Sequence, residues 1–210
     1  MDHLAKRALI VIDVQNEYFS GNLKIEYPDP KLAISNIVAA IEVAKKYEIP
    51  VIIVQNFAPE NAPLFARGTF GSELHPQLLQ FSEDLYLEKS MPSAFTGTKL
   101  EEWIKFNEIN TLTVVGFMTQ NCDDSTIKHA LHIGLNVEFL SDASGAVPYK
   151  NRAGFASAAD IHRVFSVVMQ ARFAAVLSTK EWIYCVETQQ TPIRETIFQS
   201  HENAKAFEGI

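Results

Sequence analysis

Short apolar runs alternate along the chain with longer segments of helical periodicity. Each run holds four or five residues, mostly β-branched and nearly unbroken in its strongest examples. They lie at 8–12, 51–54, 112–115, 137–140 and 174–177, and a short strand-like segment, DLYLE, lies at 84–88. Because strands that are continuously apolar are usually covered on both faces, these runs predict a parallel sheet buried between layers of helices.

The segments between the runs repeat their apolar residues at helical spacing. After Asp29, a typical N-cap residue, Pro30 takes the first helical position, and Ile34, Ile37 and Ile41 fall on one stripe. Further helices are predicted at 98–108, 122–133 and 153–173. Alternating strands and helices favour right-handed βαβ units. With no repeat or linker in 210 residues, we expect one α/β domain of about six strands.

One long segment, 58–84, interrupts this alternation. It contains Pro59, Pro63, Gly68, Gly71 and Pro76 and has no clear period. Long irregular segments in compact domains are often functional. We expect an ordered loop over the carboxyl ends of the strands, where open α/β sheets bind ligands.

Composition and charge exclude several classes of function. The chain is 47% hydrophobic and carries 18 basic against 25 acidic side chains, a net charge of −7. This balance argues against a nucleic-acid or anionic-membrane partner. The first apolar run is too short for a signal sequence or a membrane span, and two cysteines make no disulfide framework, so we expect a soluble cytoplasmic protein.

Three reactive side chains follow separate predicted strands. Asp13 ends the first, Lys89 follows the short strand at 84–88, and Cys122 follows the strand at 112–115. Taken singly, these residue types are most often a cap, a solvated lysine and a buried inert thiol. Together at one sheet edge they predict a reactive centre, in which a helix N-terminus and Lys89 lower the pKa of Cys122. Cys185 has no such setting, and we expect it to be inert.

These residues lie in motifs that resemble the isochorismatase-like family of cysteine hydrolases. The motifs are IDVQNEYF around Asp13, GTFGSELHP at 68–76, Lys89 before SAF, and GFMTQNC ending at Cys122. The resemblance spans roughly residues 7–180 and implies a Rossmann-like three-layer sandwich with strand order 3-2-1-4-5-6. A C-terminal extension is then expected from about residue 186, within a single domain over 1–210.

The resemblance also implies roles for individual residues. Asp13, Lys89 and Cys122 would be a catalytic triad, and the peptide bond between Phe117 and Met118 would be cis. The backbone N–H groups of Met118 and Cys122 would form an oxyanion hole, and Phe19 would line the substrate site. Family resemblance further implies a homodimer or homotetramer. The apolar residues of the predicted 153–173 helix, such as Phe155 and Val167, favour the same expectation.

Two differences between this chain and particular members of the family narrow the range of reactions that we expect. Nicotinamidases of the family bind a metal through an Asp-x-His pair after the second strand, whereas this chain has VQNFAPENAP there, so we expect no metal and no other cofactor. Members that cleave the vinyl ether of isochorismate often lack the cysteine. The favoured prediction is a metal-independent hydrolase of a small amide or carbamoyl compound, acting through a thioester. A vinyl-ether hydrolase and a non-catalytic thiol sensor remain alternatives.

Overall fold

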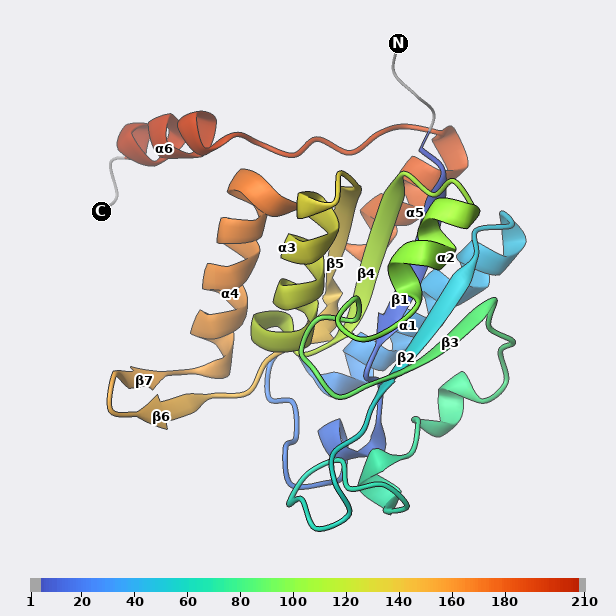
Figure 1. Cartoon of the computed structure of the whole chain (residues 1–210). Helices are drawn as coiled ribbons and strands as arrows, with labels where there is room; N and C mark the ends of the chain where they lie inside the picture. Colours follow the sequence, from blue (N-terminus) through green and yellow to red (C-terminus); the bar gives the residue numbers. More distant parts are fainter. Residues whose placement is uncertain (1–4, 208–210) are drawn as a thin grey trace.

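The computed structural model describes residues 5–207, and its centre is a parallel sheet of six strands (Figure 1). The strands are β1 (Arg7–Ile12), β2 (Val51–Asn56), β3 (Leu85–Lys89), β4 (Thr111–Phe117), β5 (Asn136–Gly145) and β8 (Ala175–Leu177). They are arranged in the order β3-β2-β1-β4-β5-β8. Since β8 is the sixth strand of this sheet along the chain, the predicted order 3-2-1-4-5-6 is confirmed.

Helices cover both faces of the sheet (Figure 1). The covering helices are α1 (Pro30–Lys46), α2 (Leu100–Phe106), α3 (Asp124–His132), α4 (Ala158–Val168) and α5 (Thr179–Thr188), whereas α6 (Ile197–Ala206) covers neither face (Figure 1). α1 and α5 pack on one face, and α2 and α3 pack on the other, with α4 beside α3. None of the helices in residues 5–207 is long and apolar enough to cross a membrane.

The unbroken apolar character of β1 follows from this double covering. Leu9 and Val11 pack in the core under α1 and α5, whereas Ile10 and Ile12 pack in the core under α2 and α3. All four side chains are fully buried. A strand in this position has no polar face, which is why its sequence does not alternate.

The long loop of 58–84 is ordered against the segment that follows β1, as predicted. It holds two short 3₁₀ turns, Phe70–Ser72 and Pro76–Leu78. The Asn16 N–H donates to the Glu73 carbonyl, and the His75 N–H donates to the Val14 carbonyl, each at 2.9 Å. The first part of the loop therefore lies at the carboxyl ends of the strands, and its end returns to the amino end of β2, where the Asp84 N–H donates to the Val51 carbonyl (Figure 1).

The prediction of one helix over 153–173 is wrong. A hairpin of β6 (Tyr149–Asn151) and β7 (Gly154–Ala156) takes its first residues, and a π-helical turn (Met169–Phe173) its last. Gly154 has φ +137°, a conformation that side chains rarely adopt, and the Ser157 side chain caps α4 by accepting from the Asp160 N–H. These local signals outweigh the apolar pattern.

The same finding changes the expected exposed surface. Phe155 is exposed, but on the hairpin, while Val164, Val167 and Val168 are exposed on α4. Phe165, Met169 and Phe173 instead pack toward the core. Only part of the segment is therefore free to form an interface.

The chain beyond α5 crosses the amino ends of the strands, where Arg7 donates to the Gln190 carbonyl and Gln170 donates to the Ile193 carbonyl (Figure 1). Residues 189–196 lead to α6, which has no buried side chain and lies above α4 (Figure 1). Both α5 and α6 begin with a capping box, from Ser178 with Glu181 and from Thr196 with Gln199. These local hydrogen bonds fix where the two helices begin.

Candidate active site

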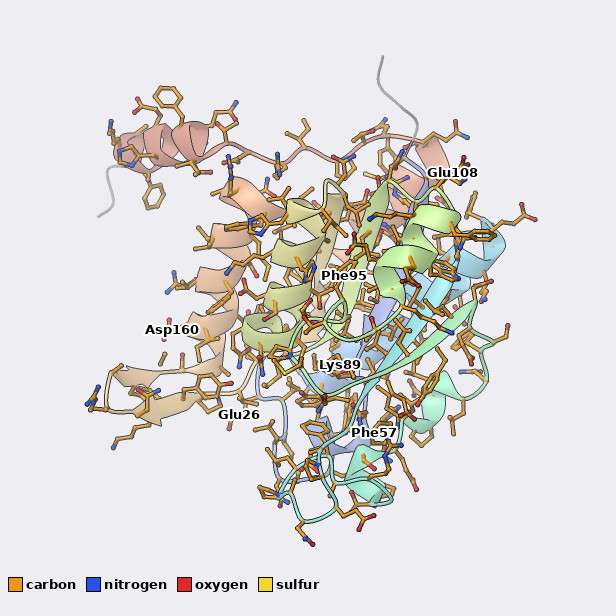
Figure 2. The ribbon with its side chains drawn as sticks, viewed as in Figure 1. Glu26, Phe57, Lys89, Phe95, Glu108 and Asp160 are labelled. Carbon is orange, nitrogen blue, oxygen red and sulfur yellow. The ribbon has the colours of Figure 1, made fainter. Side chains whose placement is uncertain are left out.

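Asp13, Lys89 and Cys122 meet at the carboxyl edge of the sheet. Lys89 Nζ lies 2.6 Å from Asp13 Oδ2 and 3.2 Å from Cys122 Sγ. Figure 2 shows Lys89 at this edge, between the loop that carries Phe57 and the segment of Phe95. The three residues are 0%, 5% and 6% exposed respectively, so the group is nearly closed to solvent.

The fold places the two charged residues at the ends of β1 and β3, which lie on either side of β2. Asp13 directly follows β1 and has φ +51°, a left-handed conformation that Asp adopts more readily than most residues. Its N–H donates to the Val54 carbonyl at 2.9 Å. Lys89 ends β3, where alternate residues Leu85, Leu87 and Lys89 are buried. The same alternation that buries the leucines therefore turns Lys89 inward.

Cys122 lies in a π-helical turn (Thr119–Asp123) between β4 and α3. The Met118 carbonyl accepts from the Asn121 and Asp123 N–H groups at 3.0 and 3.2 Å, which fixes the turn. Gly116 has φ +116°, and a Cβ there would overlap the Ile12 backbone. The peptide bond between Phe117 and Met118 is cis, as the resemblance implies.

Lys89 Nζ contacts three polar groups inside the site. Besides Asp13 and Cys122, its Nζ contacts Asn56 Oδ1 at 3.4 Å. Burial lowers the pKa of Lys89, but attraction to Asp13 and Cys122 outweighs burial and leaves the pKa above its usual value. Lys89 is therefore a fixed cation that holds the carboxylate and the sulfur together.

The expected low pKa of Cys122 is wrong for the resting site. Burial and the nearby Asp13 carboxylate raise the pKa of the thiol far above its ordinary value, against the opposing effect of Lys89. Burial also raises the pKa of Asp13, while Lys89 lowers it. The sulfur is therefore a thiol at neutral pH, and it needs a base at the moment of attack.

The other predicted site residues surround this group. Met118 directly precedes the turn of Cys122, so both backbone N–H groups of the predicted oxyanion hole belong to one short segment. Phe19 is half-buried, with its ring 4.3 Å from the His75 ring and 5.5 Å from the Phe117 ring. The roles of Met118, Cys122 N–H and Phe19 stay predictions.

The structure adds residues that the sequence did not single out for the site. Tyr18 is buried between Phe65 and Phe117, and burial together with Cys122 and Asp13 raises its pKa well above the usual value. Asp123 follows the nucleophile and is fully buried. Cys122, Asp123 and Asp124 are three consecutive candidates for the reactive group in the GFMTQNCDDST segment, and only the fold shows how deeply each side chain is buried.

The residues at the end of β2 do not form a metal site. Gln55 and Asn56 are amides engaged within the protein, since Gln55 Nε2 donates to the Ser72 carbonyl and the Asn56 N–H donates to Gln15 Oε1. Glu60 and Asn61 are exposed. In residues 5–207 no group of three or more His, Cys, Asp or Glu side chains is arranged to hold a metal ion.

Cys185 is separated from Cys122 by the sheet. Cys185 packs in the core under α1 and α5, whereas Cys122 packs in the core under α2 and α3. His129 is also structural, because its ring stacks on Phe95 at 4.8 Å and its Nδ1 hydrogen bonds to Ser93. The prediction that Cys185 does not belong to the reactive group agrees with its position.

A parallel α/β fold with a buried aspartate, lysine and cysteine at its carboxyl edge defines a hydrolase of the cysteine-dependent class. The sequence profile of the isochorismatase domain matches residues 7–181. The chain belongs to the isochorismatase family.

Individual relatives agree with this assignment. A solved structure of an isochorismatase-type protein from Burkholderia xenovorans LB400 is 57% identical and superposes with a TM-score of 0.97 over 99% of this chain and 100% of that one. The uncharacterized isochorismatase family protein YrdC of Bacillus subtilis (strain 168) is 28% identical over 85% of this chain and 95% of its own. The ureidoacrylate amidohydrolase RutB of Acinetobacter baylyi is 26% identical over 87% of this chain and 84% of its own.

Proposed function

We propose that the protein hydrolyses a C–N bond of a small amide or carbamoyl compound through a thioester on Cys122. The observation that carries the proposal is the position of Lys89 Nζ, in contact with both Asp13 Oδ2 and Cys122 Sγ in a buried site. The similarity to a ureidoacrylate amidohydrolase, whose name describes cleavage of such a bond, supports the same class of substrate.

In the first half-reaction, Asp13 takes the proton of the Cys122 thiol as the sulfur attacks the carbonyl carbon. A base is necessary because the thiol is protonated at rest. Negative charge then develops on the carbonyl oxygen, which the N–H groups of Met118 and Cys122 bind. When the C–N bond breaks, protonated Asp13 returns its proton to the departing nitrogen, and a thioester remains.

In the second half-reaction, water cleaves the thioester. Asp13 is ionised again after the nitrogen has left, so it accepts a proton from the attacking water. The same backbone groups hold the second oxyanion. As the carbon–sulfur bond breaks and the acid leaves, protonated Asp13 returns its proton to the sulfur, which restores the thiol and the carboxylate. Lys89 stays charged throughout and keeps the carboxylate and sulfur in place.

Two other functions are less well supported. A thiol sensor needs an accessible thiol of low pKa, whereas Cys122 is buried and its pKa is raised. Cys185 lies across the sheet from Cys122 and is not placed to form a disulfide with it. A vinyl-ether hydrolase would make no use of a nucleophilic sulfur, and its activity would survive loss of Cys122.

An assay of nitrogen release tests the proposal. The purified protein is incubated with a panel of primary amides and N-carbamoyl acids, and ammonia is measured, with isochorismate as a separate reaction followed by loss of its vinyl ether. We expect ammonia from at least one member of the panel. Cleavage of isochorismate alone, unaffected by replacing Cys122, would establish the vinyl-ether alternative instead.

The hydrolysis is expected to be independent of metal ions. The oxygen and nitrogen groups at the end of β2 are amides, which are poor ligands for zinc or iron. Dialysis against EDTA should leave kcat/KM unchanged. Loss of activity on chelation, with recovery on adding back one metal, would contradict this expectation.

The chain is expected to form a homo-oligomer in which α4 takes part. Val164, Val167 and Val168 are exposed on this helix, at 46%, 61% and 44%. Burying such a patch against a second copy removes apolar surface from water. Light scattering at micromolar concentration should give the mass of a dimer or tetramer of the 23.5 kDa chain, and Val167→Lys should reduce that mass. A monomer mass for the unaltered chain would rule the assembly out.

A further inference from the structure

Four buried polar side chains, beginning with Asp123 directly after Cys122, form one continuous chain of hydrogen bonds. Asp123 Oδ2 lies 2.6 Å from Ser144 Oγ, which lies 2.7 Å from Thr119 Oγ1. Thr119 Oγ1 lies 2.8 Å from His162 Nδ1. The first three residues are fully buried and His162 is 6% exposed. The chain links the residue after the nucleophile to α4.

Counting protons shows that this chain has two states. Each of its three hydrogen bonds holds one proton, and the two hydroxyl groups supply one proton each. The third must come from Asp123 or from Nδ1 of His162. If Asp123 is protonated, it donates to Ser144, Ser144 donates to Thr119, and Thr119 donates to His162. If Asp123 is ionised, all three bonds reverse and His162 must donate.

The surroundings of His162 favour the state with protonated Asp123. The ring also hydrogen bonds to the Ser141 backbone, and since Nδ1 faces Thr119, that bond belongs to the other ring nitrogen. Burial lowers the pKa of His162, although the Ser141 bond opposes this, so the ring is neutral at physiological pH. A neutral ring that donates to Ser141 accepts at Nδ1, which is the arrangement that protonated Asp123 requires.

The surroundings of Asp123 favour the same state. Its Oδ1 is buried and has no hydrogen-bond partner in residues 5–207, and an ionised carboxylate would leave this oxygen charged and unsolvated. Burial raises the pKa of Asp123 to about 7, with Asp13 and Asp124 acting in the same direction and Ser144 and Lys89 against it.

We propose that Asp123 is a positioning residue that serves hydrolysis in its protonated form, and that the chain through Ser144 and Thr119 to His162 holds it there. The inference rests on the proposed function. While Asp123 is neutral, the charges of Asp13 and Lys89 cancel. When the sulfur then becomes negatively charged, no second anion lies beside it. An ionised Asp123, one residue from the sulfur, opposes both the thiolate and the oxyanion.

Two carboxylates near the ends of this chain form ion pairs. Asp124 lies 2.7 Å from Lys128, and Asp160, in the wall of a cavity of about 460 Å³ beside His162, lies 3.1 Å from Arg163. The remaining titratable groups are Tyr18 near Asp123, and Tyr27 and Asp142 near His162. Asp142 accepts from Thr179, and the raised pKa of Tyr18 keeps it neutral.

Asp123→Asn tests the proposal through the alkaline side of the pH profile. The amide of asparagine donates to Ser144 as the protonated acid does, but it does not ionise. In the unaltered protein kcat/KM should fall as pH rises through about 7. In Asp123→Asn we expect the ratio of kcat/KM at alkaline pH to that at pH 6 to rise about tenfold, the effect of moving a pKa by one unit or more. Asp124→Asn removes a carboxylate from the next residue. Since Asp124 is only a minor cause of the raised pKa of Asp123, the fall in kcat/KM should persist and begin at a slightly lower pH.

Thr119→Val is expected to move the profile in the opposite direction. Without the threonine hydroxyl, the Ser144 proton has no acceptor except an ionised Asp123. The variant therefore favours the carboxylate, and kcat/KM should begin to fall at a lower pH. If Thr119→Val does not fold, as judged by circular dichroism, the comparison of Asp123→Asn with Asp124→Asn decides alone.

An infrared measurement separates this proposal from the proposed function, because it needs no substrate. The carbonyl band of a buried protonated carboxyl should be present at pH 6, disappear above pH 7 and be absent from Asp123→Asn at both. The band's absence at pH 6, or an alkaline profile that Asp123→Asn leaves unchanged, overturns the proposal. If the band is present but no hydrolysis is found, the proposed function is wrong, and so is the role of Asp123 in it. The protonated state of Asp123 in the hydrogen-bonded chain would still be correct.

Discussion

Replacing Cys122 with serine should lower kcat/KM for the cleaved amide by roughly 10⁴-fold or more, the loss seen when a nucleophile is removed. Even the thiol is protonated in this site, and a hydroxyl is far harder to ionise. Asp13 and Lys89 are arranged for a sulfur at 3.2 Å from Nζ, and they do not compensate for a much weaker acid. Cys122→Ala should be equally inactive.

Cys185→Ser is the matched control for this experiment. The same substitution is then made on the opposite face of the sheet, at a side chain of similar burial, 8% exposed against 6%. Turnover should persist in Cys185→Ser, and electrospray mass spectrometry of rapidly quenched samples should show an acyl adduct only on proteins that retain Cys122. Wild-type activity in Cys122→Ala would show that the sulfur is not the nucleophile.

The sequence was sufficient to place the three reactive residues because the fold makes their positions simple. Asp13 and Cys122 follow unbroken apolar strands and Lys89 ends the short alternating strand β3, and parallel strands bring their carboxyl ends to one edge. The unbroken β-branched runs define β1 and β4 without any tertiary information, whereas β3 shows only a short alternation. Motif order along the chain then identified the family, and the strand order followed from it.

The electrostatics of the site could not be predicted in the same way. Position at a helix start predicted a low pKa for Cys122, but the turn buries the sulfur and sets it beside Asp13, and both effects raise the pKa. The depth of a side chain depends on what packs over it from distant segments. For the same reason no sequence pattern indicates that Asp123 meets Ser144, 21 positions away, or that Thr119 meets His162, 43 positions away.

Local backbone signals also explain why the helix predicted from apolar periodicity over 153–173 is wrong. The apolar residues of 153–173 suggested one long helix, yet Gly154 and the Ser157 cap divide the segment into hairpin and helix. Periodicity reports which residues are apolar, whereas a left-handed glycine and a capping serine report where the backbone changes direction. Where both are present, the backbone signals deserve more weight.

Asp13→Asn should separate the reactivity of the sulfur from catalysis. Asparagine cannot accept the thiol proton or pass it to the leaving nitrogen, so kcat/KM should fall about 10²–10⁴-fold, the usual contribution of a general base. The negative charge of Asp13 also raises the pKa of Cys122, against Lys89, which lowers it. Removing that charge while keeping Lys89 should lower the thiol pKa.

Alkylation and hydrolysis are therefore expected to change in opposite directions. In a Cys185→Ala background, iodoacetamide should label Cys122 faster at neutral pH in Asp13→Asn than in the unaltered protein, because alkylation follows the thiolate fraction. Asp84→Asn, which changes an exposed carboxylate paired with Lys45, should alter neither rate. If alkylation and turnover both fall in Asp13→Asn, the carboxylate stabilises the thiolate or the structure of the site. If alkylation rises while turnover collapses, Asp13 is the base.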